Sequence, residues 1–231
     1  MSVGHSHTPL AAPIGFAHRG GTGAGRQNTL AAFSAALTAG ARGLESDVWL
    51  TADAVPVLDH DGLIAPENRR IAEYERAELP GHIPTLSELY DECGMDFELS
   101  LDILDPRAAR PVTVAARHRG AVERLWIVGE WPKVAYARAV DADVHVVANL
   151  VWWRLGPGVG SLLREIAAAG ICAINLPFWL WHPGLVARTH AAGLLAFGWR
   201  ANEQWQIDWL RRCGCDGIYS DAVGPLIEAT T

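Results

Sequence analysis

Eight short apolar, β-branched runs recur along the chain, and a segment with helical spacing follows each one. The runs are bounded by turn residues, as buried strands are, and they are Ile14–Ala17, Gly43–Leu50, Phe97–Ile103, Leu125–Val128, Val144–Ala148, Ile171–Leu176, Leu194–Trp199 and Gly217–Tyr219. The segments with helical spacing are Thr29–Ala39, Thr85–Cys93, Arg107–His118, Pro132–Val140, Gly160–Ala169, Pro183–Ala192, Glu203–Arg212 and Val223–Ala229. This alternation predicts a parallel sheet, because parallel strands need a crossover between them.

Glycines stand just past six of the helical segments, where a left-handed helix cap favours this residue. They are Gly40, Gly94, Gly120, Gly170, Gly193 and Gly214. Eight βα units with near-continuous apolar strands predict an α/β fold, a single TIM (β/α)8 barrel that spans residues 1–231. An open doubly wound sheet is the alternative, and it would also place a site at the carboxyl ends of the strands.

The composition and the terminal sequence exclude several classes of protein. Half of the 231 residues are hydrophobic and the formal net charge is −7, which argues against nonspecific binding to nucleic acid or anionic lipid. Residues Met1–Leu10 lack the pattern of a signal peptide, and no apolar run could span a membrane. Neither a zinc site nor a disulfide framework is indicated by Cys93, Cys172, Cys213 and Cys215. We therefore expect a cytoplasmic protein, whose oligomeric state the sequence leaves open.

The longest irregular stretch, Asp59–Pro84, follows the second predicted strand. It carries Pro66, Pro80 and a charged patch at Glu73–Glu78, and it is too polar and too short for a separate domain. We expect a short insertion that acts as an active-site loop or cap.

Polar side chains gather at the predicted strand ends, where TIM barrels carry their active sites. His18 and Arg19 follow the first strand and join a proton carrier to a fixed cation, although a surface ion pair is the alternative. Glu45 and Asp47 are two residues apart in the second strand, so both carboxylates share one face. Asp102 adds a third carboxylate from the third strand. Three oxygen ligands suit Mg²⁺ or Ca²⁺ better than zinc.

A second imidazole, His60, follows an apolar run that returns toward the barrel. A lone histidine at such a position is commonly structural. Paired with His18, however, it would allow one imidazole to remove a proton while the other donates one, as acid–base cleavage of a phosphodiester requires.

Short motifs along the chain carry a resemblance that spans the first to the eighth strand. They are Ala17-His18-Arg19-Gly20-Gly21, Asn28-Thr29-Leu30-Ala31-Ala32-Phe33, Glu45-Ser46-Asp47-Val48, His60-Asp61, Ile83-Pro84-Thr85-Leu86 and Asp216-Gly217-Ile218-Tyr219-Ser220-Asp221. In this order they resemble the glycerophosphodiester phosphodiesterases, with high specificity in the first third and low specificity from Pro111 to Ala192. The resemblance implies a TIM-barrel enzyme that hydrolyses glycerophosphodiesters to sn-glycerol 3-phosphate and an alcohol.

The resemblance also implies roles for particular residues. It assigns a divalent cation, Mg²⁺ or Ca²⁺, to an acidic triad made by Glu45, Asp47 and Asp102. It assigns proton transfer to His18 and His60. Phosphate binding is assigned to Arg19, and the wall of a glycerol pocket to Trp199.

Three positions depart from the family pattern. Gln27 replaces a glutamate before the first helix, and Asp102 replaces a glutamate on the third strand. Leu104 stands where the family often has a lysine that would stabilise charge on the phosphate. Arg200 is a candidate replacement for this cation, but strand alternation predicts that it faces away from Trp199.

Two other functions are consistent with the sequence. The first is a lysophospholipase D-type activity on lysolipids, with an aromatic rim formed by Trp152, Trp153, Phe178, Trp179 and Trp181. Burial between loops and outer helices is the alternative for each of these side chains. The second is a catalytically impaired barrel that binds metal and phosphate without turnover, which Gln27 and Leu104 favour.

Overall fold

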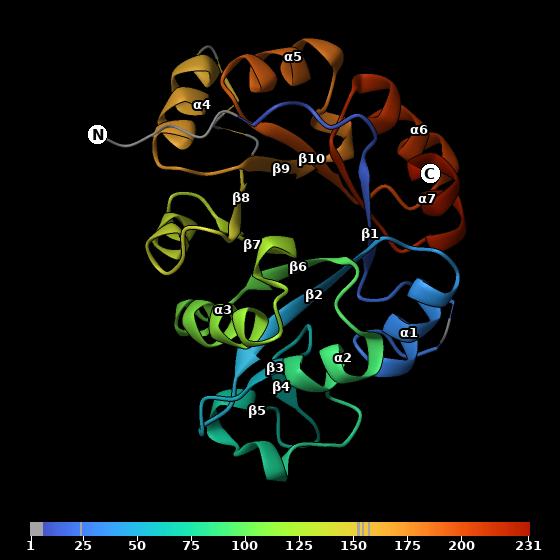
Figure 1. Ribbon diagram of the computed structural model, residues 1–231, viewed down its shortest axis with the longest axis vertical. Coiled ribbons are helices and arrows are strands. Elements are labelled where there is room, and N and C mark those ends of the chain that lie inside the picture. The colour runs from blue at the N-terminus through green and yellow to red at the C-terminus, as the bar shows by residue number, and fades with distance from the viewer. Residues whose placement is uncertain (1–6, 24, 152, 154, 157) are drawn as a thin grey trace.

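The computed structural model describes residues 7–23, 25–151, 153, 155–156 and 158–231. Its centre is a ring of eight parallel strands (Figure 1), namely β1 (Ile14–His18), β2 (Gly43–Leu50), β6 (Glu98–Ile103), β7 (Leu125–Glu130), β8 (His145–Asn149), β9 (Ala173–Pro177), β10 (Leu195–Trp199) and β11 (Gly217–Ser220). The first strand pairs with both the second and the last, which closes the sheet. The predicted TIM barrel is therefore confirmed and the open sheet is wrong.

Helices cover the outside of the ring (Figure 1). They are α1 (Leu30–Thr38), α2 (Leu86–Cys93), α3 (Ala109–His118), α4 (Val159–Ala168), α5 (Pro183–Ala191), α6 (Gln204–Cys213) and α7 (Val223–Thr230). The fourth connection differs from the prediction, since η5 (Lys133–Ala139) is a 3₁₀ helix. There the Ala135 N–H donates to the Pro132 carbonyl and the Val140 N–H donates to the Ala137 carbonyl, in each case three residues back. Further 3₁₀ turns are η3 (Pro106–Ala108), η4 (Val122–Arg124) and η7 (Phe178–Leu180).

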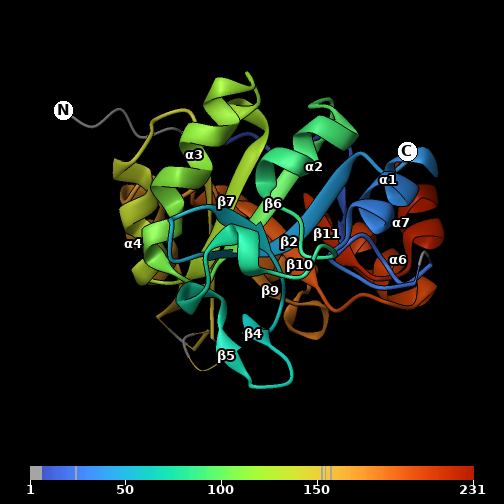
Figure 2. The same cartoon turned by 90° about the horizontal axis from the view of Figure 1, so that it is seen from below.

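The insertion after β2 is more ordered than a loop. Strand β3 (Pro56–Leu58) returns antiparallel to β2, and β4 (Leu63–Ile64) pairs with β5 (Arg69–Arg70) before the turns η1 (Ile71–Glu73) and η2 (Arg76–Glu78). It has a hydrophobic cluster of its own, made by Val57, Ile64, Ile71, Leu79 and Ile83. In Figure 2 the β4–β5 hairpin extends beyond the ring at the end away from the N-terminus.

The barrel interior is divided along its axis into an aromatic part and a polar part. Phe16 stacks on Tyr219 with ring centroids 4.8 Å apart, and Trp126 lies 5.2 Å from Phe197. Tyr219 also marks the boundary, because its hydroxyl hydrogen-bonds Ser100 at 2.9 Å and its ring contributes to the polar cavity above. The aromatic part thus closes the barrel beneath the carboxyl ends of the strands.

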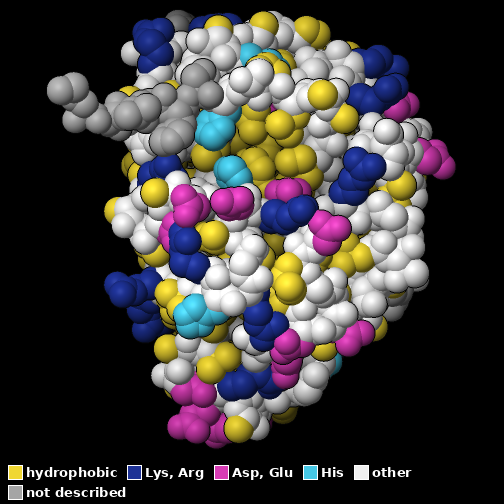
Figure 3. Space-filling model, in the orientation of Figure 1, with side chains coloured by type: hydrophobic (Ala, Val, Ile, Leu, Met, Phe, Trp, Pro, Cys, Tyr) yellow, Lys and Arg dark blue, Asp and Glu magenta, His cyan; other side chains and the backbone are white. Residues whose placement is uncertain are grey.

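The surface shown in Figure 3 mixes charges of both signs around a hollow that contains hydrophobic side chains. Local ion pairs such as Arg124 with Asp96, at 2.9 Å, are typical of such a surface. None of the helices in the described part of the chain is long and apolar enough to cross a membrane.

Candidate active site

Two adjoining cavities open at the carboxyl ends of the strands. The first, which we call the carboxylate lobe, has a volume of about 290 Å³ and contains all three predicted ligand carboxylates. The second, which we call the arginine lobe, has a volume of about 320 Å³ and contains two arginines. Both lobes are lined by His18, Arg19, His60, Trp199 and Tyr219. The structure therefore brings together every site residue predicted from the sequence.

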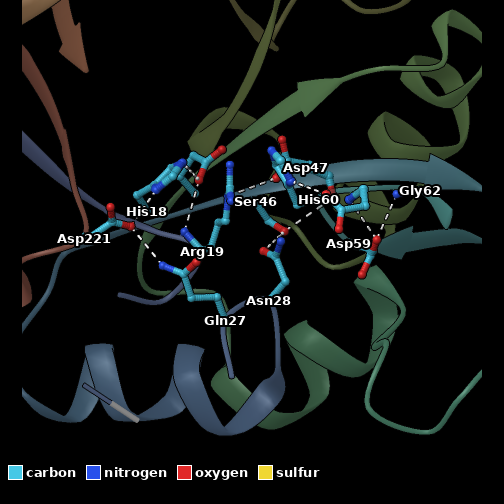
Figure 4. A network of polar contacts seen from close by, with 12 residues as sticks. His18, Arg19, Gln27, Asn28, Ser46, Asp47, Asp59, His60, Gly62 and Asp221 are labelled. Atoms are coloured by element: carbon cyan, nitrogen blue, oxygen red, sulfur yellow. Dashed lines mark hydrogen bonds and ion pairs between the residues drawn. The ribbon is translucent and has the colours of Figure 1, made fainter. Parts of the chain in front are cut away.

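His18 ends β1 between two carboxylates. Its Nδ1 lies 2.7 Å from Oδ1 of Asp221 (Figure 4), and its Nε2 lies 3.7 Å from Oε2 of Glu45. Burial lowers the pKa of His18, but Glu45 and Asp221 together raise it by more, so the net pKa is above its ordinary value. With Nδ1 held by Asp221, the Nε2 atom lies on the side of Glu45, and His18 lines both lobes.

Arg19 turns the chain sharply at the mouth of the barrel. Its φ of 52° is left-handed, and its backbone N–H donates to Oε2 of Glu45 at 3.1 Å. The turn continues through Gly20, at φ 79°, where a Cβ would come within 2.8 Å of the Ala32 backbone. Glycine is therefore required for the close approach of this loop to α1. The side chain then points inward, with Nε 3.4 Å from Oδ2 of Asp47.

Three carboxylates crowd the first lobe. Asp47 and Asp102 are register partners on neighbouring strands, and Glu45 lies two residues before Asp47 on the same face of β2. Burial raises the pKa of Glu45 to about 8, and Asp47 and Asp102 add to the shift. Burial and then Asp47 raise the pKa of Asp102 to about 7, while burial is also the main cause of the raised pKa of Asp47. Such a group is stabilised by a cation.

The oxygen donors fit a hard divalent cation, although they are not gathered around one position as they stand. Oδ2 of Asp47 is buried and forms no hydrogen bond, although Nε of Arg19 lies 3.4 Å from it. Among the described residues, no three His, Cys, Asp or Glu side chains form a ready-made metal cluster. The Arg19 N–H donates to Glu45 and the Arg19 side chain pairs with Asp47, so a bound ion would share these carboxylates with Arg19.

His60 reaches the cavity from the insertion. It follows β3, and its Nδ1 lies 2.7 Å from Oδ1 of Asp61. Asp59 shapes this turn by accepting the N–H of Gly62 at 2.9 Å (Figure 4) and that of Asp61 at 3.0 Å. Like His18, His60 therefore has Nδ1 beside a carboxylate and lines both lobes.

The sequence prediction missed the residues that orient His18. Asp221 follows β11, and its Oδ1 accepts from both His18 and Gln27, whose Nε2 lies at 2.9 Å. Hydrogen bonds, that of His18 first, hold the pKa of Asp221 below its usual range. The position of Asp221 at the end of the eighth strand was the signal available. Gln27, identified only as a missing carboxylate, is thus a hydrogen-bond donor to this network.

Two asparagines on neighbouring strands were also missed. Asn149 and Asn175 are register partners in β8 and β9, and Nδ2 of Asn175 donates to Oδ1 of Asn149 at 2.9 Å. Both line the carboxylate lobe. Their places at or near predicted strand ends were the only signal in the sequence.

The positions around the rim give mixed outcomes. Trp199 and Leu104 line the carboxylate lobe as expected. Arg200 does not point away, because its φ of 60° interrupts the strand alternation and its side chain shares the arginine lobe with Trp199. Trp181 does not belong to a rim: it is 1% exposed, and its Nε1 donates to the Phe197 carbonyl at 2.8 Å.

The remaining candidate aromatics lie at the surface or outside the described residues. Trp153 and Trp179 are exposed, and Phe178 is half-buried with its ring centroid 5.3 Å from that of Trp179. Trp179 in turn lies 6.4 Å from Trp199. Trp152 lies outside the described residues.

Comparison with known proteins places this geometry in a family. The model of the glycerophosphoryl diester phosphodiesterase family matches residues 18–225. A Mycobacterium tuberculosis protein named as a glycerophosphodiester phosphodiesterase is 27% identical over 236 residues, covering 90% of this chain and 87% of that protein. A structure from Silicibacter pomeroyi, named as a glycerophosphoryl diester phosphodiesterase, superposes with a TM-score of 0.82 and 26% identity, covering 95% and 93% of the two chains.

A second solved structure shares the fold at lower identity. It is an Oleispira antarctica phosphodiesterase in complex with its product sn-glycerol-3-phosphate, with a TM-score of 0.81 and 20% identity over 94% of this chain and 96% of that one.

Proposed function

The chain belongs to the glycerophosphoryl diester phosphodiesterase family, and from this we propose that it hydrolyses glycerophosphodiesters to sn-glycerol 3-phosphate and an alcohol by metal-dependent His/His catalysis. The observation that carries the proposal is the pair of imidazoles in one cavity. His18 comes from the barrel and His60 from the insertion, and each has Nδ1 beside a carboxylate. Such a contact fixes the ring and leaves Nε2 for proton transfer.

The proton transfers balance across this pair. A water or substrate hydroxyl forms a new bond to phosphorus while one imidazole takes its proton. The bond between phosphorus and the leaving oxygen breaks, and the other imidazole gives its proton to that oxygen. Where water is the nucleophile, this step gives sn-glycerol 3-phosphate directly, and the two imidazoles regain their starting states by proton exchange with solvent. Where a substrate hydroxyl is the nucleophile, the step gives a cyclic phosphodiester. Water then opens this ring with the proton roles of the two imidazoles reversed, which gives sn-glycerol 3-phosphate and restores both starting states.

The acidic triad would hold the cation. We assign Mg²⁺ or Ca²⁺ to Glu45, Asp47 and Asp102, supported by the raised pKa of each carboxyl group and by the buried Oδ2 of Asp47, which accepts no hydrogen bond. When bound, the cation neutralises the triad and withdraws charge from the phosphate oxygens. Arg19 would bind the phosphate, and Trp199 would pack against the glycerol carbons.

A lysolipid is the second candidate substrate. It is favoured by Trp179, whose indole is 53% exposed and lies near Trp199 at the cavity wall. Such a side chain could contact an acyl chain that leaves the cavity. Turnover of lysolipids but not of glycerophosphodiesters would make this the main activity.

Histidine variants test the proposal against a barrel that binds without turnover. We expect His18→Ala and His60→Ala each to abolish release of sn-glycerol 3-phosphate while leaving the melting temperature near that of the parent, because both rings lie at the cavity rather than in the core. His118→Ala, an exposed histidine on α3, serves as the control. Parent-level turnover in either site variant would remove that histidine from the mechanism.

We also propose that residues 1–231 form one domain that works in the cytoplasm. The closed ring from β1 to β11 supports the first point. The unpaired thiols of Cys93, Cys172, Cys213 and Cys215 support the second, since disulfides belong to oxidising compartments.

A further inference from the structure

We propose that Arg200 is a phosphate-binding residue of this site and supplies the cation that Leu104 does not. The inference rests on the proposed function. The family pattern would place a phosphate-binding cation at position 104, directly after β6. We assign this role instead to Arg200, directly after β10.

The backbone directs Arg200 into the cavity. Arginine rarely adopts a left-handed conformation, yet Arg19 has a φ of 52° and Arg200 a φ of 60°, each directly after a barrel strand. Both arginines line the arginine lobe together with His18 and His60. Unfavourable backbone angles of this kind concentrate at functional sites.

The segment after Arg200 is anchored. Asn202 Nδ2 donates to Oδ2 of Asp221 at 2.7 Å, and the Asp221 N–H donates back to Oδ1 of Asn202 at 2.9 Å. These two bonds tie the end of β10 to the end of β11, directly beside the carboxylate that holds His18. The position of Arg200 is thus coupled to the network that orients the imidazole.

The charge of Arg200 is uncompensated, whereas that of Arg19 is paired with Asp47. In the described part of the chain Arg200 forms no ion pair or hydrogen bond. Its guanidinium lies over the ring of Trp199, with Cζ 5.0 Å from the centroid. Trp199 therefore steadies the cation without neutralising it. The nearby carboxylate of Asp221 is already shared among His18, Gln27 and Asn202.

Leu104 faces the other side of the site. It lines the carboxylate lobe beside Asp102, and Arg200 lines only the arginine lobe. A phosphate between the imidazoles would meet Arg19 and Arg200 from the β1 and β10 sides and an apolar side chain from the β6 side. The guanidinium also offers several N–H donors, which suits the oxygens of a phosphate.

The test compares charge at position 200 with charge elsewhere. Arg200→Asn removes the cation but keeps a residue that tolerates the left-handed conformation, and Arg200→Lys keeps the charge. Arg211→Asn, at an exposed arginine near the end of α6, is the matched control. The measurements are kcat and KM on a glycerophosphodiester, inhibition constants for sn-glycerol 3-phosphate and inorganic phosphate, and the melting temperature.

We expect Arg200→Asn to raise both inhibition constants at least tenfold and to raise KM, with an unchanged melting temperature. Arg200→Lys should retain part of the affinity, and Leu104→Lys added to Arg200→Asn should restore part of it. If Arg200→Asn and Arg211→Asn have equal inhibition constants, the assignment of Arg200 is wrong, and the proposed function still stands as long as the parent protein turns over substrate. If the parent protein shows no turnover, the proposed function is wrong. The role of Arg200 is then tested by measuring the dissociation constants of sn-glycerol 3-phosphate and inorganic phosphate directly.

Discussion

Replacing Glu45 by glutamine should stabilise the metal-free protein. The pKa of Glu45 is raised from 4.5 to about 8 by burial, with Asp47 and Asp102 contributing. The unfolded chain therefore releases this proton above pH 4.5, whereas the folded chain keeps it until about pH 8. The folded state holds more protons across that window, so its stability falls as the pH rises through it.

The size of the effect follows from the shift. At about 1.4 kcal/mol per pKa unit, Glu45 destabilises the folded chain by on the order of 3 kcal/mol at pH 7. We expect Glu45→Gln in EDTA to recover about 1–3 kcal/mol there, since neighbouring carboxyl groups readjust their protonation. Urea unfolding from pH 4.5 to pH 8.5 should show a steeper loss of stability in the parent protein than in the variant.

Metal should reverse the order of the two proteins. Saturating Mg²⁺ or Ca²⁺ stabilises whichever folded chain binds it, so the parent protein should gain more than Glu45→Gln. Glu92→Gln, at an exposed carboxylate on α2, controls for loss of a charge. Parallel pH curves for the parent protein and Glu45→Gln, together with equal responses to cation, would refute both the buried-charge argument and the assignment of the ligand.

Three further outcomes follow from the same structure. Asp221→Asn should lower kcat more than it raises KM, because His18 Nδ1 loses a charged partner; an unchanged kcat would exclude the positioning role. Leu104→Lys should raise turnover without lowering the melting temperature, because Leu104 is 42% exposed and the new charge can be solvated; a destabilised variant with no gain in rate would contradict this. Trp181→Ala should cost about 3–5 kcal/mol in urea unfolding, because the indole is buried and bonded to the Phe197 carbonyl; a loss below 1 kcal/mol would show that the cavity collapses.

The barrel fold could be predicted from the sequence because each buried strand is marked by the residues of its own segment. Runs such as Leu125–Val128 are continuous and apolar enough to identify without knowledge of their partners. The pairing of β1 with β11, which closes the ring, joins residues about 200 positions apart. Only the count of eight units indicated it. The 3₁₀ helix η5 was not readable, because its hydrogen-bond pattern depends on how the short connection fits between two fixed strands.

Part of the candidate active site could also be predicted from the sequence. The carboxyl ends of all the barrel strands lie at the same end of the barrel, and alternate residues of a strand share a face. These two rules were enough to group His18, Glu45, Asp47 and Asp102. Arg200 could not be placed, since its left-handed φ changes the direction that alternation predicts.

Contacts between distant segments were equally hidden. The bond from Gln27 to Asp221 joins positions 194 residues apart. The burial of Trp181 depends on how its segment packs against β10 and α6, where its backbone carbonyl accepts from Trp209 Nε1 at 3.0 Å. Neither has a local sequence signature.

The most direct measurement is release of sn-glycerol 3-phosphate by the purified protein from a panel of glycerophosphodiesters, with Mg²⁺, with Ca²⁺ and with EDTA. The account predicts release with at least one of the two cations, loss of release in EDTA, and no release by His18→Ala or His60→Ala under any condition. Binding of sn-glycerol 3-phosphate without turnover of any member of the panel, in a folded protein supplied with either cation, would contradict it.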